Sequence, residues 1–269
     1  MPPFRRWAGT MFLRLPAPLR SLRRLPILGD FIHRLSHLIL PSNETVWAQV
    51  REGPLEGIWL ELNPRTGRSY LYGDAESRGQ QLLSQQLRPG MVFYDLGANI
   101  GLYSLLAARI VGAAGCVYSF EPDPEVAARL RRNIARNGFA NVTVVEAGVW
   151  STSVILNFVA AGSASPDKGT GMLVPEGHNS AGTEIRCIAL DDFFASAPPP
   201  HVIKCDVEHA EVEALRGARK LIETSHPWIF CEMHSEENSH AACEFLSSLG
   251  YAFESVDTNH IAASPEALH

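Results

Sequence analysis

Cysteine is scarce in this chain of 269 residues, and its few cysteines show no pairing pattern. The five cysteines are an odd number, and no two of them form a Cys-x-x-Cys pair. A secreted domain stabilised by disulfides typically has an even number of cysteines. A free cysteine in an apolar segment instead behaves as a small hydrophobe. The sequence therefore predicts reduced thiols in a reducing, cytoplasmic compartment.

Long hydrophobic runs are also absent. No run reaches the roughly 18 apolar residues that a membrane-spanning helix requires. Arg interrupts the short apolar stretches of the N-terminus, which argues against a signal peptide. Residues 1–41 hold seven Arg and one Asp, a formal charge of +6, whereas the whole chain has −6, so the remainder carries −12. This acidic balance argues against a general nucleic-acid-binding protein.

The basic N-terminal extension, residues 1–45, has two interpretations. Pro16, Pro18 and Pro26 divide it into short pieces, because proline interrupts helices, and this favours a solvated helical extension packed on the domain. Its Arg content also fits a basic amphipathic helix that contacts anionic lipid or a partner protein. Peripheral membrane contact by a cytoplasmic protein is therefore an open alternative.

Three signatures of common enzyme classes are missing as well. The chain has no Gly-x-Ser-x-Gly elbow, so a serine hydrolase is not expected. It has no His-Glu-x-x-His or other tight metal-ligand motif, so no metal site is expected. It also lacks the Gly-x-Gly-x-x-Gly fingerprint of dinucleotide-binding proteins.

What the chain does have, from residue 91 onward, is a regular alternation of apolar strand-like segments with helical ones. Such alternation predicts a mainly parallel sheet with helices on both faces. Within it we expect helices at residues 102–111 and 211–223, among others. A polar loop rich in Gly and Ser, residues 162–182, separates two expected strands and could act as a lid.

Two shorter segments precede this main domain. Residues 46–90 are expected to contain a hairpin around Asn63–Gly67 and a helix over residues 75–87 that leads into the core. The predicted organisation is therefore an N-terminal extension (1–45), a connecting segment (46–90) and a main α/β domain (91–269).

Acidic residues stand where the predicted strands end. In parallel sheets, ligands bind outside the carboxyl ends of the strands, near the point where the strand order reverses. A purely structural sheet has little reason to place acids at successive strand ends. The residues concerned are Asp95, Glu121, Glu146, Asp206 and Glu232.

The segment "YDLGANIG" predicts a cofactor loop between the first strand of the main domain and the helix that follows. Gly97 and Gly101 allow a tight turn and a close approach by a ligand, and the helix start offers free N–H groups. Asp95, just before the glycines, would repel a pyrophosphate but suits the amine of a methionine moiety. This favours S-adenosylmethionine over a dinucleotide. Glu121 could then accept hydrogen bonds from ribose hydroxyls, and Glu146, followed by Ala147, could meet the adenine amino group.

Two further segments, "KCDVEHAE" and "CEMH", bring polar residues to the ends of two later strands. Asp206 and Glu208 are two residues apart, as are Glu232 and His234, so each pair faces one side of an extended strand end. Asp206 is the expected neighbour of the reacting methyl group, and Glu232 could bind the acceptor or orient His234. The candidate bases are Glu208, His209 and His234.

Plainer explanations of these residues stay open. Glu208 and Glu211 could merely favour the first turn of the next helix, and His234 could be an ordinary loop residue. Carboxylates and imidazole could also hold Mg, Ca or Mn, although the chain has no metal-ligand motif.

The motifs "YDLGANIGLYSLLAA", "SFEPDPEVAARLRRNIARNG" and "IKCDVEHAEVEALRGA" together resemble the FkbM family of S-adenosylmethionine-dependent methyltransferases. The resemblance implies a class I methyltransferase fold, a Rossmann-like and mainly parallel seven-stranded sheet. It also implies O-methylation of a hydroxyl on a sugar or natural product. The family usually has Gly where this chain has His209, so either the backbone turn is altered or His209 adds a group at the mouth of the site. The candidate cofactor-binding residues are Asp95, Gly97, Ala98, Asn99, Gly101, Glu121, Pro122, Glu146, Ala147 and Asp206, and the candidate catalytic residues are Asp206, Glu208, His209, Glu232 and His234.

Two other functions remain as alternatives. One is a non-catalytic module that binds a nucleotide-like ligand and recruits a partner through the basic extension. The other is an NAD-dependent oxidoreductase, which the glycine spacing disfavours. The sequence names neither the acceptor nor the oligomeric state.

Overall fold

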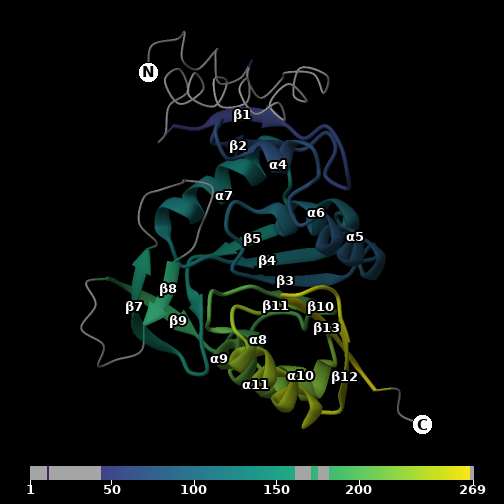
Figure 1. The fold of residues 1–269 in the computed structure, drawn as a ribbon, viewed down its shortest axis with the longest axis vertical. Coiled ribbons are helices and arrows are strands. Elements are labelled where there is room, and N and C mark those ends of the chain that lie inside the picture. Colours follow the sequence, from purple (N-terminus) through teal and green to yellow (C-terminus); the bar gives the residue numbers. More distant parts are fainter. Residues whose placement is uncertain (1–10, 12–43, 161–170, 175–181, 267–269) are drawn as a thin grey trace, which may run out of the picture. The chain divides into compact units, whose positions relative to one another are not determined.

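The computed structural model describes Met11 and residues 44–160, 171–174 and 182–266. The described residues form two compact units, residues 44–77 and residues 78–160 with 171–174 and 182–266. Figure 1 labels the helices and strands of both. Nearly all of the predicted N-terminal extension lies outside the described residues. Of the helices in the described ranges, none is both long and apolar enough to cross a membrane.

The first unit contains a small hairpin. Strands β1 (Val46–Gln49) and β2 (Trp59–Leu62) pair antiparallel, with Val46 opposite Leu62. The hairpin is present, but its turn lies between these strands and not at Asn63–Gly67 as expected. The side chain of Asn63 accepts a hydrogen bond from the N–H of Arg65 (2.8 Å). This local turn leads into the short helix α4 (Arg68–Leu71) instead of a second strand.

The second unit is built on a seven-stranded sheet in the order β12-β13-β11-β10-β3-β4-β5. The five strands from β11 to β5 are parallel, and β13 runs antiparallel to both of its neighbours. This confirms the mainly parallel seven-stranded sheet. The strands are β3 (Val92–Leu96), β4 (Cys116–Phe120), β5 (Val142–Val145), β10 (Val202–Cys205), β11 (Trp228–Glu232), β12 (Tyr251–Ser255) and β13 (His260–Pro265).

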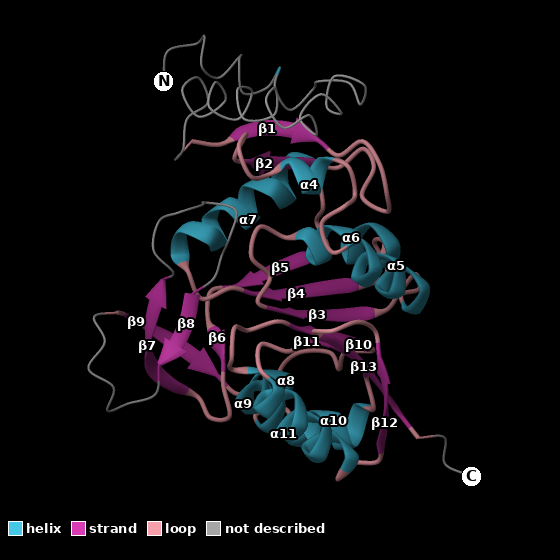
Figure 2. Ribbon diagram, viewed as in Figure 1, coloured by secondary structure: helices cyan, strands magenta, loops and turns pink. Residues whose placement is uncertain are grey.

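Helices cover both faces of this sheet (Figure 2). One face carries α5, α6 and α7, and the other carries α8 to α11, whose apolar residues form a large buried cluster with β3, β10 and β11. The helices are α5 (Ser77–Gln86), α6 (Leu102–Val111), α7 (Pro124–Asn137), α8 (Leu190–Phe194), α9 (Glu211–Arg216), α10 (Arg219–Ser225) and α11 (Glu236–Ser247).

The single helix expected over residues 211–223 is in fact two. Helix α9 ends at Arg216, and α10 begins at Arg219. The carboxylate of Asp191 in α8 accepts hydrogen bonds from the N–H groups of Lys220 (3.1 Å) and Leu221 (2.9 Å). Side-chain capping of a new helix start compensates for the interrupted helix, and it depends on a residue distant in sequence.

A second sheet was not predicted. Strands β6 (Gly148–Val149), β7 (Val154–Ala160), β8 (Gly171–Val174) and β9 (Thr183–Ile188) form a four-stranded sheet in the order β6-β9-β7-β8. Strands β7 and β9 were expected, but β8 lies inside the segment read as a polar loop and pairs antiparallel with β7. The rest of that segment, residues 162–170 and 175–181, lies outside the described residues.

Candidate functional site

The strand order reverses between β3 and β10, since the chain proceeds from β3 to β4 and β5 on one side and from β10 to β11 on the other. A crevice at such a switch point is where ligands bind in parallel sheets. The glycine loop follows β3 at this point. The N–H groups of Gly97 and Ala98 both donate to the carbonyl of Phe120 at the end of β4 (3.0 and 2.9 Å). The loop is thus fixed to the neighbouring strand.

The two glycines are required by the packing of the chain itself. Gly97, Asn99 and Gly101 all have positive φ angles, of 75°, 49° and 96°. A Cβ on Gly97 would overlap the backbone carbonyl of Asp206, and a Cβ on Gly101 would overlap a methyl group of Leu130 in α7. The glycine pattern therefore has a cause inside the chain, in addition to any closeness to a ligand.

Asp95 lies buried beneath this loop. Ser104 donates a hydrogen bond to its Oδ2 (2.5 Å), and its Oδ1 lies 3.7 Å from the Nζ of Lys204. Burial raises the pKa of Asp95, and Lys204 opposes this effect. Lys204 also donates to the carbonyl of Gly97 (3.0 Å) and to Oδ2 of Asp206 (3.1 Å). Lys204 therefore ties the end of β3, the glycine loop and Asp206 together.

Glu121 joins the end of β4 to the glycine loop. It is buried, its Oε2 accepts from the N–H of Asn99 (2.8 Å), and its Oε1 accepts from the N–H of Asp123 (3.0 Å). Burial raises its pKa to about 7, against the opposing effect of these two hydrogen bonds. Each carboxylate oxygen has two lone pairs, so Glu121 can still accept further hydrogen bonds. Pro122 follows it and is half-buried.

Glu146 does not join this group of buried side chains. It is exposed and forms an ion pair with Arg131 of α7 (2.7 Å). Its neighbour Ala147 is buried, and the N–H of Ala147 donates to the carbonyl of Val145 (3.0 Å).

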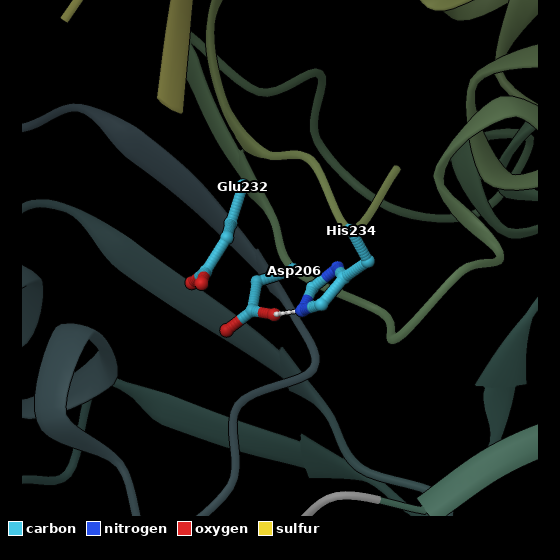
Figure 3. Close-up of side chains that lie close together, drawn as sticks. All are labelled: Asp206, Glu232 and His234. Carbon is cyan, nitrogen blue, oxygen red and sulfur yellow. Dashed lines mark ion pairs between the residues drawn. The ribbon is translucent and has the colours of Figure 1, made fainter. Parts of the chain in front are cut away.

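Four of the candidate catalytic residues converge at the ends of β10 and β11. Cys205 and Cys231 are register partners in these parallel strands, so the residues that follow start side by side. The Nε2 of His234 lies 3.7 Å from Oδ1 of Asp206 and 3.4 Å from Oε2 of Glu208. Figure 3 shows Asp206, Glu232 and His234 close together, and one atom from each lies within 4.8 Å of the others.

The route by which Glu208 reaches this position differs from the expectation. The chain is not extended after β10, because Glu208 and His209 have φ angles of 48° and 72°. A left-handed turn, and not strand alternation, directs Glu208 toward His234. His209 has a positive φ, a conformation that glycine adopts freely, so the histidine is held in a glycine-like turn. Its exposed ring lies 5.4 Å from the ring of His234, measured between centroids.

Sequence reasoning gave Glu211 no part in the site, but it is central to the cluster. It is fully buried and lies 2.8 Å from Nδ1 of His234. It also accepts hydrogen bonds from the N–H of His209 (2.9 Å) and the side-chain amide of Asn238 (2.9 Å). The hydrogen bond with Glu211 raises the pKa of His234 to about 9. Burial opposes this rise, and the charges of Glu211, Glu208 and Asp206 add to it.

His260 is the second residue that the sequence did not reveal. It is opposite Glu232 in the pairing of β11 with β13, and its Nε2 lies 3.4 Å from Oε2 of Glu232. Its Nδ1 lies 2.8 Å from Oδ1 of Asp257, and its ring stacks on Phe230. Burial alone would lower the pKa of His260, but Glu232 and Asp257 raise it to about 9.

Within the described residues, Asp206, Glu232 and His234 form a donor set that could hold a divalent cation. Each already has a charged partner: Lys204 for Asp206, His260 for Glu232 and Glu211 for His234. The arrangement as it stands is therefore a network of carboxylates and cations of the chain itself.

A family model described as the methyltransferase FkbM domain matches residues 95–253. The chain belongs to the FkbM methyltransferase family. It is a methyltransferase, and its cofactor is S-adenosylmethionine.

Two curated relatives illustrate the family. The hexuronic acid methyltransferase AglP of Haloferax volcanii is 28% identical over 188 residues, which cover 68% of this chain and 74% of AglP. The 31-O-demethyl-FK506 methyltransferase FkbM of Streptomyces tacrolimicus is 37% identical over 103 residues, which cover 38% of this chain and 34% of that protein. A solved FkbM methyltransferase from Methylobacillus flagellatus has 17% identity and a TM-score of 0.48, over 71% of this chain and 59% of that one.

The residues of this FkbM-family chain fit the cofactor. Among the described residues, the buried Oδ1 of Asn99 in the glycine loop has no hydrogen-bond partner, and such an atom needs a donor. Glu121, beside it, retains acceptor capacity for ribose hydroxyls. The carboxylates of Asp206, Glu208 and Glu232 suit a ligand that carries a sulfonium and an amine.

Proposed function

We propose that this FkbM-family methyltransferase is an O-methyltransferase that modifies a hydroxyl on a sugar or on a natural product. The observation that carries the proposal is the convergence of Asp206, Glu208, Glu232 and His234 at the ends of β10 and β11. Methyl transfer to a hydroxyl gains from a group that removes the proton. A cluster of carboxylates and imidazole supplies such groups.

The cofactor contributes an activated methyl group, and the chain must hold the cofactor and the acceptor in line. In our proposal Gly97, Ala98, Asn99 and Gly101 form the cradle for the methionine end, and Asp95 supports the cradle from below. Glu121 accepts hydrogen bonds from the ribose. Lys204 links Asp206 directly to the glycine loop. For this reason we place Asp206 nearest the reacting methyl group.

Glu232, Glu208, His209 and His234 form the acceptor side of the proposed site. Glu208 and His234 lie within 3.4 Å of each other, so a proton taken from the acceptor can be held by the pair. Correct placement of the hydroxyl accounts for much of the rate in such a reaction. The names of AglP, a hexuronic acid methyltransferase, and FkbM, a 31-O-demethyl-FK506 methyltransferase, support a sugar or natural-product acceptor.

The test is release of S-adenosylhomocysteine from S-adenosylmethionine with a panel of acceptors: glucuronic acid, galacturonic acid and 31-O-demethyl-FK506. We expect acceptor-dependent release with at least one of them. The product should survive mild alkali, because a methyl ether is stable where a methyl ester is hydrolysed. An alkali-labile product would mean that a carboxylate is methylated, and it would contradict the proposal.

A binding measurement separates this result from a failed cofactor site. We expect S-adenosylhomocysteine to bind in isothermal titration, with NAD as the negative control. Binding of NAD in its place would favour the oxidoreductase alternative. Binding without turnover on any acceptor of the panel would favour the non-catalytic module.

A further inference from the structure

We propose that His234 is the catalytic residue that takes the proton of the acceptor hydroxyl, and that Glu211 is the positioning residue that fixes its orientation. This inference rests on the proposed O-methyl transfer and deepens it. Of the candidate bases Glu208, His209 and His234, it selects His234. It also gives a role to Glu211, to which no motif assigned one.

The orientation of the imidazole follows from its two nitrogens. Nδ1 lies 2.8 Å from Oε1 of Glu211, which is fully buried. Nε2 faces the other way, 3.7 Å from Oδ1 of Asp206 (Figure 3). It also lies 3.4 Å from Oε2 of Glu208. In the neutral ring one nitrogen donates and the other accepts. A carboxylate on Nδ1 therefore keeps the proton there and leaves the lone pair on Nε2.

Glu211 is itself held from three elements. It begins α9, and it accepts hydrogen bonds from the N–H of His209 before α9 and from the side chain of Asn238 in α11. Asn238 also donates to the carbonyl of His209 (3.1 Å). An acid that only favoured the first turn of a helix would face solvent. Glu213, two residues further along α9, is such an acid, because it pairs with Arg216 at the surface.

The acceptor oxygen forms a bond to the methyl carbon while the carbon–sulfur bond breaks, and sulfur keeps the electron pair. The hydroxyl proton passes to Nε2 of His234. The resulting imidazolium is stabilised by the buried carboxylate of Glu211, as in other catalytic histidines oriented by a third group.

Other charged and titratable groups also face His234. Asp206 and Glu208 approach from the turn after β10, Glu232 lies at the end of β11, and the ring of His209 is adjacent. Together with Glu211 these carboxylates favour the protonated ring in the absence of ligand. A cationic cofactor at the same edge offsets them and favours the neutral ring that can accept a proton.

The arrangement can be measured directly, without an acceptor. In the full chain labelled with ¹⁵N-histidine, saturated with S-adenosylhomocysteine and held at about pH 10, above the pKa of about 9, long-range ¹H–¹⁵N spectra report which ring nitrogen of neutral His234 carries the proton. His234→Asn provides the assignment. We expect the neutral ring to carry its proton on Nδ1. A proton on Nε2 would overturn the proposal, and this result needs no variant at position 211.

Glu211→Gln tests the positioning role, with Glu213→Gln as the matched control on the same helix. We expect Glu211→Gln to lower the pKa of His234, because a negative partner is lost, and Glu213→Gln to leave it unchanged. An unchanged pKa in a folded Glu211→Gln variant would contradict the role of Glu211.

Kinetics with an acceptor of the panel that supports turnover complete the test. The rate should rise with pH through the pKa of His234, since the neutral ring is the active form. In Glu211→Gln the rising limb should move to lower pH while kcat at its plateau falls by about tenfold or more, with an unchanged KM for S-adenosylmethionine. A fall in kcat without movement of the limb would show a merely structural role. Binding of S-adenosylhomocysteine without turnover on any acceptor of the panel would instead contradict the proposed function, and the NMR result would still decide the orientation.

Discussion

Gly97 packs directly against the backbone carbonyl of Asp206, so the cofactor loop and the acceptor side of the site meet without a side chain between them. This contact joins the ends of β3 and β10. It makes the glycine a structural requirement and also places it at the centre of the proposed site.

Gly97→Ala should therefore destabilise the fold and weaken S-adenosylhomocysteine binding. Its positive φ of 75° costs a residue with a Cβ about 1–2 kcal/mol, and the overlap with Asp206 adds to this. Gly138→Ala is the matched control, because its φ is 71° and no atom lies within 4 Å of its Cβ position. Urea denaturation should show a clearly larger loss for Gly97→Ala. Equal losses would mean that the contact with Asp206 is unimportant.

Glu121→Ala should weaken S-adenosylhomocysteine binding by about 1.5–3 kcal/mol, the range of hydrogen bonds to a charged group. Because the pKa of Glu121 is raised to about 7, wild-type affinity should also fall as the pH drops below 7 and the carboxylate is protonated. Titration calorimetry at pH 6 and pH 8 measures both effects. Glu146→Ala is the comparison. Because Glu146 forms an ion pair with Arg131 at the surface, we expect this variant to change the affinity for S-adenosylhomocysteine little. A loss of affinity comparable to that of Glu121→Ala would show that Glu146 does contact the adenine.

Much of the fold could be predicted from the sequence because its signals are local. Helix α6 occupies the expected residues 102–111, and β3, β4, β10 and β11 are strands of the alternation expected from residue 91 onward. Apolar runs bounded by Gly and Pro specify these elements without knowledge of their partners. Strand β8 could not be predicted, because it is only four residues long and lies inside a polar segment. These residues form a strand by pairing with β7.

The residues of the site also divide into those that local sequence patterns reveal and those that depend on distant contacts. Asp206, Glu208, Glu232 and His234 could be grouped because parallel strands end at one edge. His260 could not, since it reaches Glu232 only through the register of the antiparallel strand β13. The role of Glu211 was also hidden, because the sequence does not distinguish a buried acid from an exposed one at a helix start.

His209→Gly should stabilise the protein by about 1–2 kcal/mol, since His209 holds a φ of 72° that glycine adopts freely. His226→Gly is the control: His226 ends α10 with a φ of 47° in the same left-handed region. Both variants should gain stability in urea denaturation. A loss confined to His209→Gly would show that the contact between the rings of His209 and His234 outweighs the backbone strain.

His260 should make stability depend on pH. Its pKa is raised to about 9 in the folded state, above the usual value of 6.5. Its contribution is therefore fully present below pH 6.5 and is lost as the pH rises to 9. The shift corresponds to at most about 3 kcal/mol. His260→Gln should flatten this part of the curve in urea denaturation at pH 6, 7.5 and 9. The control is His240→Gln, since His240 is an exposed histidine on α11. A wild-type curve that is unchanged by His260→Gln would contradict the pairing with Glu232 and Asp257.

Removal of divalent metal should leave methyl transfer intact. Asp206, Glu232 and His234 have the spacing of a cation site, but Lys204 lies 3.1 Å from Asp206 and His260 lies 3.4 Å from Glu232. Cationic groups so close to the carboxylates neutralise part of the charge that would attract a divalent ion and repel the ion itself. We expect turnover after EDTA treatment to stay within about twofold of the untreated rate, on the same acceptor. A loss that Mg²⁺ or Mn²⁺ restores, and that Asp206→Asn makes insensitive to metal, would show that these three side chains act as ligands.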